Sequence, residues 1–365
     1  MKGRKIGTPP ARRLGRRATL WSGTVALGMA STLLAACGGS AGTESGAGAE
    51  GGVDEVTFLN VLPMESLTFA PEMIADTCAG SFKEQRLDVT FQATEGSAPA
   101  VQSIIAGSAL LTRVGDIETI IATGDKHAPV TNVGTAEHVG GIRMVSSTRA
   151  PIESPEDFRG KMIGIPSEGG TSEITLDLVL ASAGIPTAEV DRQVVGLTPA
   201  IFNLVKSGRI DAYVVSLDVA VALERQQPQA VVYNPSEDVT SGAQLYMTSE
   251  EQAQDPQARD QIRRYLKAIR SAIDFIVKDE ANGFNQTMEC ISSKYNVPAL
   301  EDKAVTRESL STYVDSWTAH GSDHMLETNP QQWAATYQDM VAAGVVDAGL
   351  NPKDWYTNAY VPDAP

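Results

Sequence analysis

From Val53 onward, short apolar runs alternate with amphipathic segments along the chain. Residues 56–62 form an apolar run that predicts a strand, and residues 87–93 alternate apolar and polar positions with period two, which predicts a second strand. Residues 69–82 between them predict a helix, with Pro71 near its start. Strands that alternate with helices in this way indicate an α/β protein with a mainly parallel sheet.

Two segments, residues 97–116 and residues 197–218, resemble each other. Each begins with a Ser or Thr that is expected to cap a helix, continues with apolar residues at helical spacing, and reaches a glycine, Gly107 or Gly208, that ends the helix. A short strand, a polar residue and another helix follow in both. The pair suits a protein of two similar lobes, although ordinary α/β sequences also produce such pairs by chance.

The same patterns place the remaining elements. Strands are predicted within 139–148, 160–170, 231–233 and 245–249, with a short helical connection at 154–160. Long helices are predicted at 256–278, 281–295, 306–320 and 329–343, before an extended, aromatic tail at 351–362.

Residues 164–180 (GIPSEGGTSEITLDLVL) combine a strand end, a loop of small polar residues and an apolar helix. Thr171 or Ser172 is expected to cap that helix, and Gly184 to stop it. Loop amides and hydroxyls can donate hydrogen bonds to a ligand at the positive end of the helix. The candidate binding residues in this loop are Ser167, Gly169, Gly170, Thr171 and Ser172. A well-capped loop that holds no ligand is the alternative.

Three other strand ends are expected to face the same crevice, because open α/β sheets bind ligands at the carboxyl ends of their strands. The candidate binding residues there are Glu65, Thr68, Phe69, Asp116, Ile117, Glu118, Ser216 and Asp218. Carboxylates converge in this set and no Lys or Arg does, which favours amines, amidine-like rings or sugar-like donors over anions. Asp116 and Asp218 have a simpler alternative role as caps of the helices that follow them.

The N-terminal region has the pattern of an export signal. Its first 36 residues carry seven basic and no acidic side chains, and an uncharged apolar stretch ends in residues 34–37 (LAAC), which resemble the bacterial lipobox. We expect residues 1–36 to be a lipoprotein signal peptide, Cys37 to carry the lipid, and residues 37–52 to form a flexible tether. A transmembrane anchor is the alternative. Arg16-Arg17 leaves open whether export is general or twin-arginine.

Charge and cysteine content narrow the function. The formal net charge is −16 although seven basic residues lie in the predicted signal, which disfavours nucleic acid or anionic lipid as a partner. Besides Cys37, the chain has Cys78 and Cys290, both in predicted helices, so a disulfide and two free buried thiols stay open. His320 and His324 are expected in a surface loop. No metal-ligand spacing or catalytic motif occurs, so no metal, no cofactor and no enzymatic activity is expected.

Two segments resemble the substrate-binding proteins of ABC importers, namely residues 156–185 (EDFRGKMIGIPSEGGTSEITLDLVLASAGI) and residues 199–224 (PAIFNLVKSGRIDAYVVSLDVAVALE). The subgroup most similar to them binds nitrate, sulfonates, taurine and thiamine-pyrimidine precursors, and the tail at 354–362 is similar to that of the subgroup. The resemblance implies an α/β type II periplasmic-binding-protein fold, with a ligand crevice between two lobes. Leu217 departs from this family, which often carries Trp there, so the ligand class cannot be carried over.

The resemblance also implies lobe boundaries. The two crossing strands would lie near residues 140–147 and 242–248. Lobe 1 would then comprise residues 53–147 and residues 242–365, which include the C-terminal helices, and lobe 2 would comprise residues 148–241.

We therefore expect a monomeric, extracytoplasmic solute-binding lipoprotein on the outer face of the bacterial cytoplasmic membrane. It would hand a small polar organic molecule to an ABC permease and its ATPase. The acidic crevice favours an amine heterocycle similar to a thiamine-pyrimidine precursor, with a sulfonate or nitrate second. A ligand-sensing or adhesive lipoprotein without a transporter is one alternative. An enzyme is the other, because fungal thiamine-pyrimidine synthases share the fold, but their cysteine-rich motif is missing here.

Overall fold

The computed structural model describes residues 52–61, 64–94, 96–166, 168–196 and 198–363. Residues 51–365 form one compact unit, which is the part considered below. The predicted signal peptide (1–36), Cys37 and almost all of the predicted tether (37–52) lie outside the described residues, as does Ser167. In the described part, no helix has both the length and the apolar character needed to cross a membrane.

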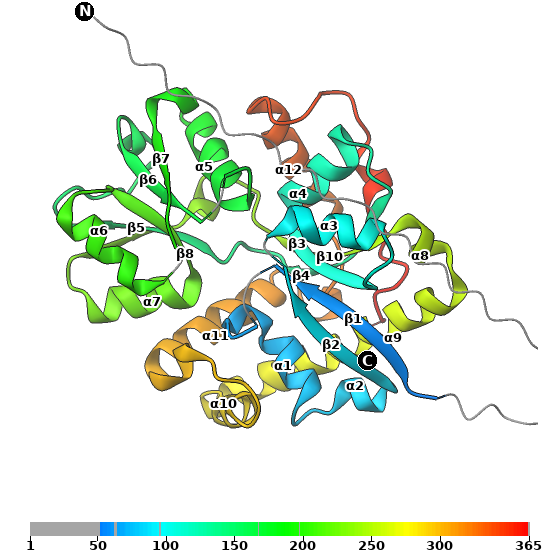
Figure 1. Cartoon of the computed structure of the whole chain (residues 1–365). Helices are drawn as coiled ribbons and strands as arrows, with labels where there is room; N and C mark the ends of the chain where they lie inside the picture. The colour runs from blue at the N-terminus through cyan, green and yellow to red at the C-terminus, as the bar shows by residue number, and fades with distance from the viewer. Residues whose placement is uncertain (1–51, 62–63, 95, 167, 197, 364–365) are drawn as a thin grey trace, which may run out of the picture. The chain divides into compact units, whose positions relative to one another are not determined.

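The strands form two five-stranded sheets. Sheet A has the order β2-β1-β3-β10-β4, with bounds Leu87–Ala93, Asp54–Asn60, Leu111–Gly115, Gln244–Ser249 and Val130–Glu137. Sheet B has the order β7-β6-β8-β5-β9, with bounds Asp191–Val194, Met162–Ile165, Ala212–Ser216, Ile142–Ser147 and Ala230–Tyr233. The strands β5 to β8 gather in the green part of the chain (Figure 1).

One strand in each sheet is antiparallel to both of its neighbours. In sheet A it is β10, between β3 and β4, and in sheet B it is β5, between β8 and β9. Strand β1 pairs with β2 and β3 in parallel, and β6 pairs with β7 and β8 in parallel. The reversed strands are the ones that the chain enters on changing sheets, from β4 to β5 and from β9 to β10. Their amino ends therefore lie at the edge where the parallel strands have their carboxyl ends.

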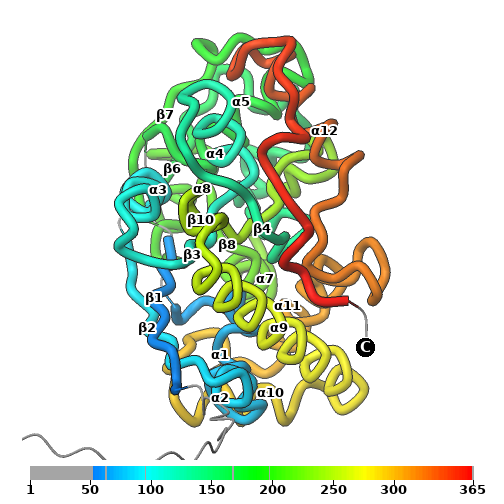
Figure 2. Tube along the Cα trace, turned by 90° about the vertical axis from the view of Figure 1, so that its right-hand side faces the viewer, coloured from blue at the N-terminus to red at the C-terminus, as the bar shows by residue number. Residues whose placement is uncertain are grey.

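Helices flank the sheets. Their bounds are α1 Ala70–Asp76, α2 Ser81–Glu84, α3 Ser97–Ile105, α4 Asp116–Ile120, α5 Thr171–Ser182, α6 Phe202–Ser207, α7 Leu217–Gln226, α8 Glu250–Gln254, α9 Pro256–Asp279, α10 Asn285–Ser292, α11 Lys303–Trp317 and α12 Pro330–Ala342. The C-terminal segment runs beside α9 (Figure 2), where the ring of Tyr360 lies 5.4 Å from the guanidinium of Arg263.

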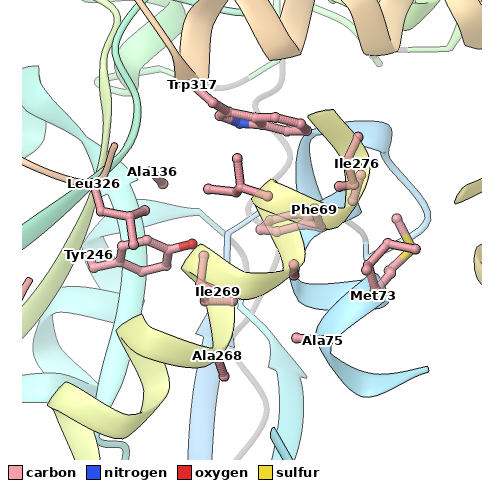
Figure 3. Packing of buried hydrophobic residues seen from close by; sticks show 14 of the residues in the cluster. Phe69, Met73, Ala75, Ala136, Tyr246, Ala268, Ile269, Ile276, Trp317 and Leu326 are labelled. Carbon is pink, nitrogen blue, oxygen red and sulfur yellow. The ribbon is translucent and has the colours of Figure 1, made fainter. Parts of the chain in front are cut away.

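The largest apolar cluster packs against sheet A. Helix α9 contributes a stripe at helical spacing, Ile262, Leu266, Ile269, Ile273 and Ile276, all at most 1% exposed. Figure 3 shows Ile269 and Ile276 facing residues of α1 and Trp317 of α11. Burial of each such side chain stabilises the fold by about 1.5–3 kcal/mol. A second cluster joins sheet B to apolar residues of α4, α5 and α12.

Two of the predicted helices are shorter than expected. The predicted helix at 69–82 is interrupted, because α1 ends at Asp76 and Gly80 adopts the left-handed conformation (φ 60°) before α2 begins. The predicted helix at 281–295 is reduced to α10, since Gly283 and Phe284 both have positive φ immediately before it. Gly107, Gly184 and Gly208 have positive φ at helix ends, as predicted.

The predicted hydroxyl caps are not formed. The residues that precede α3 and α5 are Gly96 and Gly170, and neither helix has a side-chain cap. The hydroxyls of Ser97 and Thr171 instead donate to one carboxylate, that of Glu118. The caps were predicted from local preference alone, whereas an acceptor from another element competes for the same hydroxyls.

Candidate functional site

A cavity of about 430 Å³ lies at the edge where strands of both sheets end. Its wall is built by residues at or after the carboxyl ends of β1, β2, β3, β4, β6 and β8 and by the first residues of β5 and β10. The polar side chains that line it are Thr68, Thr94, Ser97, Glu137, Thr171, Ser172, Ser216, Gln244 and Tyr313. The volume is within the range of small-molecule sites, roughly 300–1,000 Å³.

Several predicted binding residues line this cavity. They are Thr68, Gly170, Thr171, Ser172 and Ser216. Thr68 lies in the short turn between β1 and α1, Gly170 precedes α5, Thr171 and Ser172 begin α5, and Ser216 is the last residue of β8. The structure thus brings together hydroxyls from segments that are distant in the sequence, as the strand-end argument predicts.

Glu118 lies behind the wall and joins two of its elements. Its carboxylate accepts hydrogen bonds from Ser97, the first residue of α3, and from Thr171, the first residue of α5. Burial raises the pKa of Glu118, and the hydroxyl of Thr171 partly offsets that rise. No residue that the structure describes donates a hydrogen bond to the second oxygen, Oε2. Glu118 therefore links the sheet A side of the cavity to the sheet B side.

Asp116 is directed away from the larger cavity. Its carboxylate accepts from the backbone N–H groups of Ile117 (2.8 Å), Gly242 (3.0 Å) and Ala243 (3.2 Å). Burial raises the pKa of Asp116 to about 7, whereas these three N–H donors lower it. Ile117 is fully buried in the second apolar cluster. Asp116 thus joins the start of α4 to the connection that leads into β10.

The remaining predicted residues contribute less directly. Glu65 is exposed and Phe69 is buried, and neither lines the cavity. The N–H of Gly169, which was expected to point at a ligand, donates to the carboxylate of Glu173 in α5. Asp218 is 9% exposed in the first turn of α7, and burial raises its pKa, partly offset by a hydrogen bond from Ser216.

Among the described residues that line the cavity there is no Arg or Lys, but one cation lies directly behind the wall. Arg113 of β3 is 2% exposed and contacts two residues that line the cavity. It lies 2.6 Å from Glu137 Oε1, and it donates to the backbone oxygen (2.6 Å) and to the hydroxyl (2.7 Å) of Thr68. A second carboxylate, that of Glu72 in α1, lies 3.6 Å from it. The signal in the sequence is a single charge inside an apolar strand, LLTRVG.

Other residues that line the cavity have no comparable feature in the sequence that marks them as part of a site. Gln244 begins β10, Tyr313 lies in α11, and Thr94 follows β2. Glu137 ends β4, a strand that the sequence patterns did not predict. Each reaches the cavity through the pairing of strands or the packing of a helix, which local periodicity does not report.

Cys78 and Cys290 are joined in a disulfide, with their Cα atoms 5.5 Å apart. Cys290 lies in α10, but Cys78 lies in the turn after α1 rather than in a helix as expected. The bridge ties the interruption between α1 and α2 to α10. Among the described residues, no group of three His, Cys, Asp or Glu side chains could hold a metal ion.

Two histidines from distant segments meet, His138 from the connection between β4 and β5 and His320 from the turn after α11. The rings of His138 and His320 lie edge to face, 4.7 Å between centroids. His138 is 2% exposed, and within the described part of the chain neither of its ring nitrogens has a hydrogen-bond partner. Burial, and then the charge of His320, lower the pKa of His138 to about 4. Asp116 and His138 both border a second, much smaller cavity.

Comparison with known proteins agrees with this geometry. A family model described as NMT1/THI5 like matches residues 68–282. The riboflavin-binding protein RibY of Chloroflexus aurantiacus is 25% identical over 305 residues, which cover 81% of this chain and 83% of that protein.

Solved structures share the fold. The alkanesulfonate-binding protein SsuA of Xanthomonas axonopodis pv. citri has a TM-score of 0.61 at 14% identity, over 83% of this chain and 98% of its own. The nitrate-binding protein NrtA of Synechocystis also has a TM-score of 0.61, at 15% identity, over 84% of this chain and 87% of its own. The desulfurization enzyme DszB has a TM-score of 0.52 at 14% identity, over 84% and 97%. The predicted type II periplasmic-binding-protein fold with two lobes is confirmed.

Proposed function

Because the chain belongs to the NMT1/THI5-like family, we propose that it is an extracytoplasmic solute-binding lipoprotein that delivers a small polar organic molecule to an ABC importer. The observation that carries the proposal is the cavity of about 430 Å³, lined by polar side chains from both sheets. Side chains from two lobes that meet around one cavity suit a protein that closes on a ligand and later releases it. The curated relative is itself named as a binding protein.

The chemistry of the wall supports a nitrogen heterocycle as the ligand. Of the described residues that line the cavity, Glu137 alone carries a charge, and the rest offer hydroxyl, amide and backbone groups. The positive charge of Arg113, 2.6 Å from Glu137, is already paired with carboxylates. Riboflavin, which the curated relative is named for, is also a nitrogen heterocycle. A sulfonate or nitrate, as in the SsuA and NrtA neighbours, stays the second candidate ligand.

The membrane attachment is proposed from the sequence. Residues 1–36 would be removed, Cys37 would carry the lipid, and residues 37–52 would hold the binding unit away from the outer face of the cytoplasmic membrane. Within this binding unit, the second of the two lobes would comprise residues 148–241. Metabolic labelling with palmitate tests the anchor: label should enter the chain and should be absent from Cys37→Ala.

A thermal-shift screen of the purified full chain tests the binding function. The panel should include riboflavin, aminopyrimidines, primary amines, sulfonates, nitrate and amino acids. A ligand at a hundred times its dissociation constant stabilises the folded state by about 2.7 kcal/mol, which raises the melting temperature measurably. Uptake of the ligand identified in this way should fall in cells that lack this protein. A melting temperature that no compound raises, or unchanged uptake, counts against the proposal.

A further inference from the structure

Resting on the proposed binding function, we propose that the cavity selects an uncharged ligand, which donates a hydrogen bond to Glu137 while Arg113 neutralises the charge of that carboxylate. The proposal names the ligand class more narrowly than the binding function does. It also narrows the preference for amines and amidine-like rings that the acidic strand ends suggested, because it excludes their cationic forms. The inference starts from how Glu137 is held.

Glu137 presents one oxygen to the cavity. Its side chain is 1% exposed, and the residue forms part of the cavity wall. The oxygen Oε1 accepts from the hydroxyl of Thr68 (2.6 Å) and lies 2.6 Å from Arg113. In the described part of the chain, no hydrogen bond reaches the other oxygen, Oε2. A carboxylate oxygen that opens onto the cavity and has no protein donor can accept a hydrogen bond from a bound ligand.

Arg113 supplies the opposite charge. Although burial by itself lowers the pKa of Arg113, the carboxylates of Glu137 and Glu72 raise it above its ordinary value, so the guanidinium stays charged. It lies over the ring of Phe69, 5.0 Å from the centroid, and its bonds to Thr68 fix its plane. A cation fixed at hydrogen-bond distance from Glu137 largely cancels the field that the carboxylate would otherwise project into the cavity.

Glu72 is the more distant of the two carboxylates beside Arg113. Its closest atom is 3.6 Å from Arg113, and it does not line the cavity. Burial raises the pKa of Glu72, with the charge of Arg113 opposing the rise, and Tyr246 donates to it at 2.7 Å. Arg113 is therefore matched chiefly by Glu137, the carboxylate at 2.6 Å.

Uncharged groups complete the wall. Thr68 is fully engaged, since its hydroxyl donates to Glu137 and accepts from Arg113. No hydrogen bond within the described residues engages the side chains of Ser172, Gln244 and Tyr313, all of which line the cavity. A cation would be attracted by Glu137 and repelled by Arg113, and a sulfonate would meet the reverse. Neither regains what it loses on leaving water, whereas a neutral ring with an N–H edge needs only hydrogen bonds.

Calorimetry with two nearly isosteric probes tests the selection directly. One probe is a hydroxymethyl aminopyrimidine, which is neutral near pH 7. The other is the same ring with an aminomethyl group, which is protonated there. Riboflavin and its imide-N-methylated derivative form a second pair that differs only in one N–H donor. We expect at least tenfold tighter binding of the neutral, N–H-bearing member of whichever pair binds. Tighter binding of the cation, or equal binding of the N-methylated ring, overturns the inference.

Glu137→Gln and Glu72→Gln form a matched pair of variants, because both remove a carboxylate beside Arg113 and only Glu137 faces the cavity. In Glu137→Gln the neutral ligand should bind at least tenfold more weakly, and methanesulfonate should bind measurably because Arg113 is no longer matched. In Glu72→Gln both affinities should stay within threefold of the wild type. Equal losses in the two variants mean a structural role and refute the inference.

The outcomes separate this inference from the function on which it rests. If a cation or an anion binds the wild-type protein best, the binding function stands and the selection of neutral ligands fails. If no probe of any charge binds, both fail. The probe pairs compare ligands on the unchanged protein, so they decide the question even if Glu137→Gln does not fold.

Discussion

At the scale of single residues, the absence of a side chain at Gly115 allows two elements of the cavity wall to contact each other. A Cβ atom at this position would lie 2.5 Å from Glu118 Oε2 and 3.3 Å from the side chain of Thr171. The first distance is shorter than side-chain atoms tolerate. Glu118 can therefore approach Thr171 of the other sheet's helix α5 only because residue 115 has no side chain.

Gly115→Ala should displace Glu118 and weaken the contact with Thr171. We expect the free energy of unfolding to fall by about 1–3 kcal/mol, as for other overpacked sites, together with weaker binding of the ligand found in the thermal-shift screen. Urea denaturation and calorimetry measure the two effects. Gly196→Ala is the control, because its Cβ would meet only contacts of 3.9 Å and its φ is ordinary, so neither quantity should change. Equal effects in the two variants would contradict this explanation.

His138 is the second residue whose surroundings decide its behaviour. Its pKa is about 4 in the folded protein and near 6.5 when unfolded, so protonation favours the unfolded chain. Above pH 6.5 both states are neutral and His138 has no effect. As the pH falls from 6.5 to 4, its contribution should reduce the free energy of unfolding by up to roughly 3 kcal/mol.

Replacing His138 by Asn should remove that part of the pH dependence. Urea denaturation at several pH values should show the wild type losing more stability than His138→Asn on acidification, with the difference confined below pH 6.5. Because Asp116 borders the same small cavity and titrates in the opposite sense, only the difference between the two proteins is informative. His324→Asn, at an exposed residue, should behave like the wild type. Parallel pH profiles for wild type and His138→Asn contradict the prediction.

At the scale of elements, short helix α4 is tied to the strand that returns to sheet A. Asp116, its first residue, accepts three backbone N–H bonds, two of them from the residues just before β10. Helix α4 also packs its Ile117 and Ile120 into the cluster shared with α5, α12 and sheet B. The connection between the sheets is thereby braced by a carboxylate that the sequence had suggested for the ligand.

Asp116→Asn should therefore act on stability. One of its carboxylate oxygens becomes an NH₂ group that faces backbone N–H donors, so at least one buried hydrogen bond is lost. We expect a decrease of about 1–3 kcal/mol in the free energy of unfolding, measured above pH 7 where the carboxylate is ionised. Ligand affinity should stay within threefold, and the exposed Glu65→Gln should alter neither quantity. A large loss of affinity with unchanged stability would falsify this assignment.

At the scale of the whole compact unit, contacts between distant segments hold the two sheets' flanking helices together. The disulfide joins residues 212 positions apart, and Arg225 of α7 pairs with Glu308 of α11 at 2.9 Å. The exposed ion pair contributes little. The disulfide restricts the unfolded chain over a long loop and so stabilises the fold without touching the cavity.

Removing the bridge should lower stability and leave binding intact. For Cys78→Ser/Cys290→Ser we expect the free energy of unfolding to fall by about 2–4 kcal/mol. Neither cysteine lines the cavity, so the dissociation constant should stay within threefold. Reducing agent should lower the wild type's stability and leave the double variant unchanged. If reductant has no effect on the wild type, the disulfide does not form in solution.

The sequence by itself determined the features that depend on near neighbours in the chain. Strand β2 matches its predicted range, the helices end at the predicted glycines, and four predicted residues at or after the carboxyl ends of β6 and β8 line the cavity, namely Gly170, Thr171, Ser172 and Ser216. Periodicity and backbone preferences are local properties and predict the elements. Because open α/β sheets bind ligands at the carboxyl ends of their strands, the predicted elements also indicate where a cavity forms.

Only the tertiary structure decided which polar groups come together at the cavity. Thr68 and Glu137 are 69 residues apart, and Arg113 meets them through the pairing of β1 with β3 and of β10 with β3 and β4. Three further features depend on tertiary contacts in the same way. They are the interruption of the predicted helix at Gly80, the hydrogen bonds from Ser97 and Thr171 to Glu118, and the acceptance of backbone N–H bonds by Asp116. A buried polar group must find a partner, and that partner is selected by proximity in space rather than along the chain.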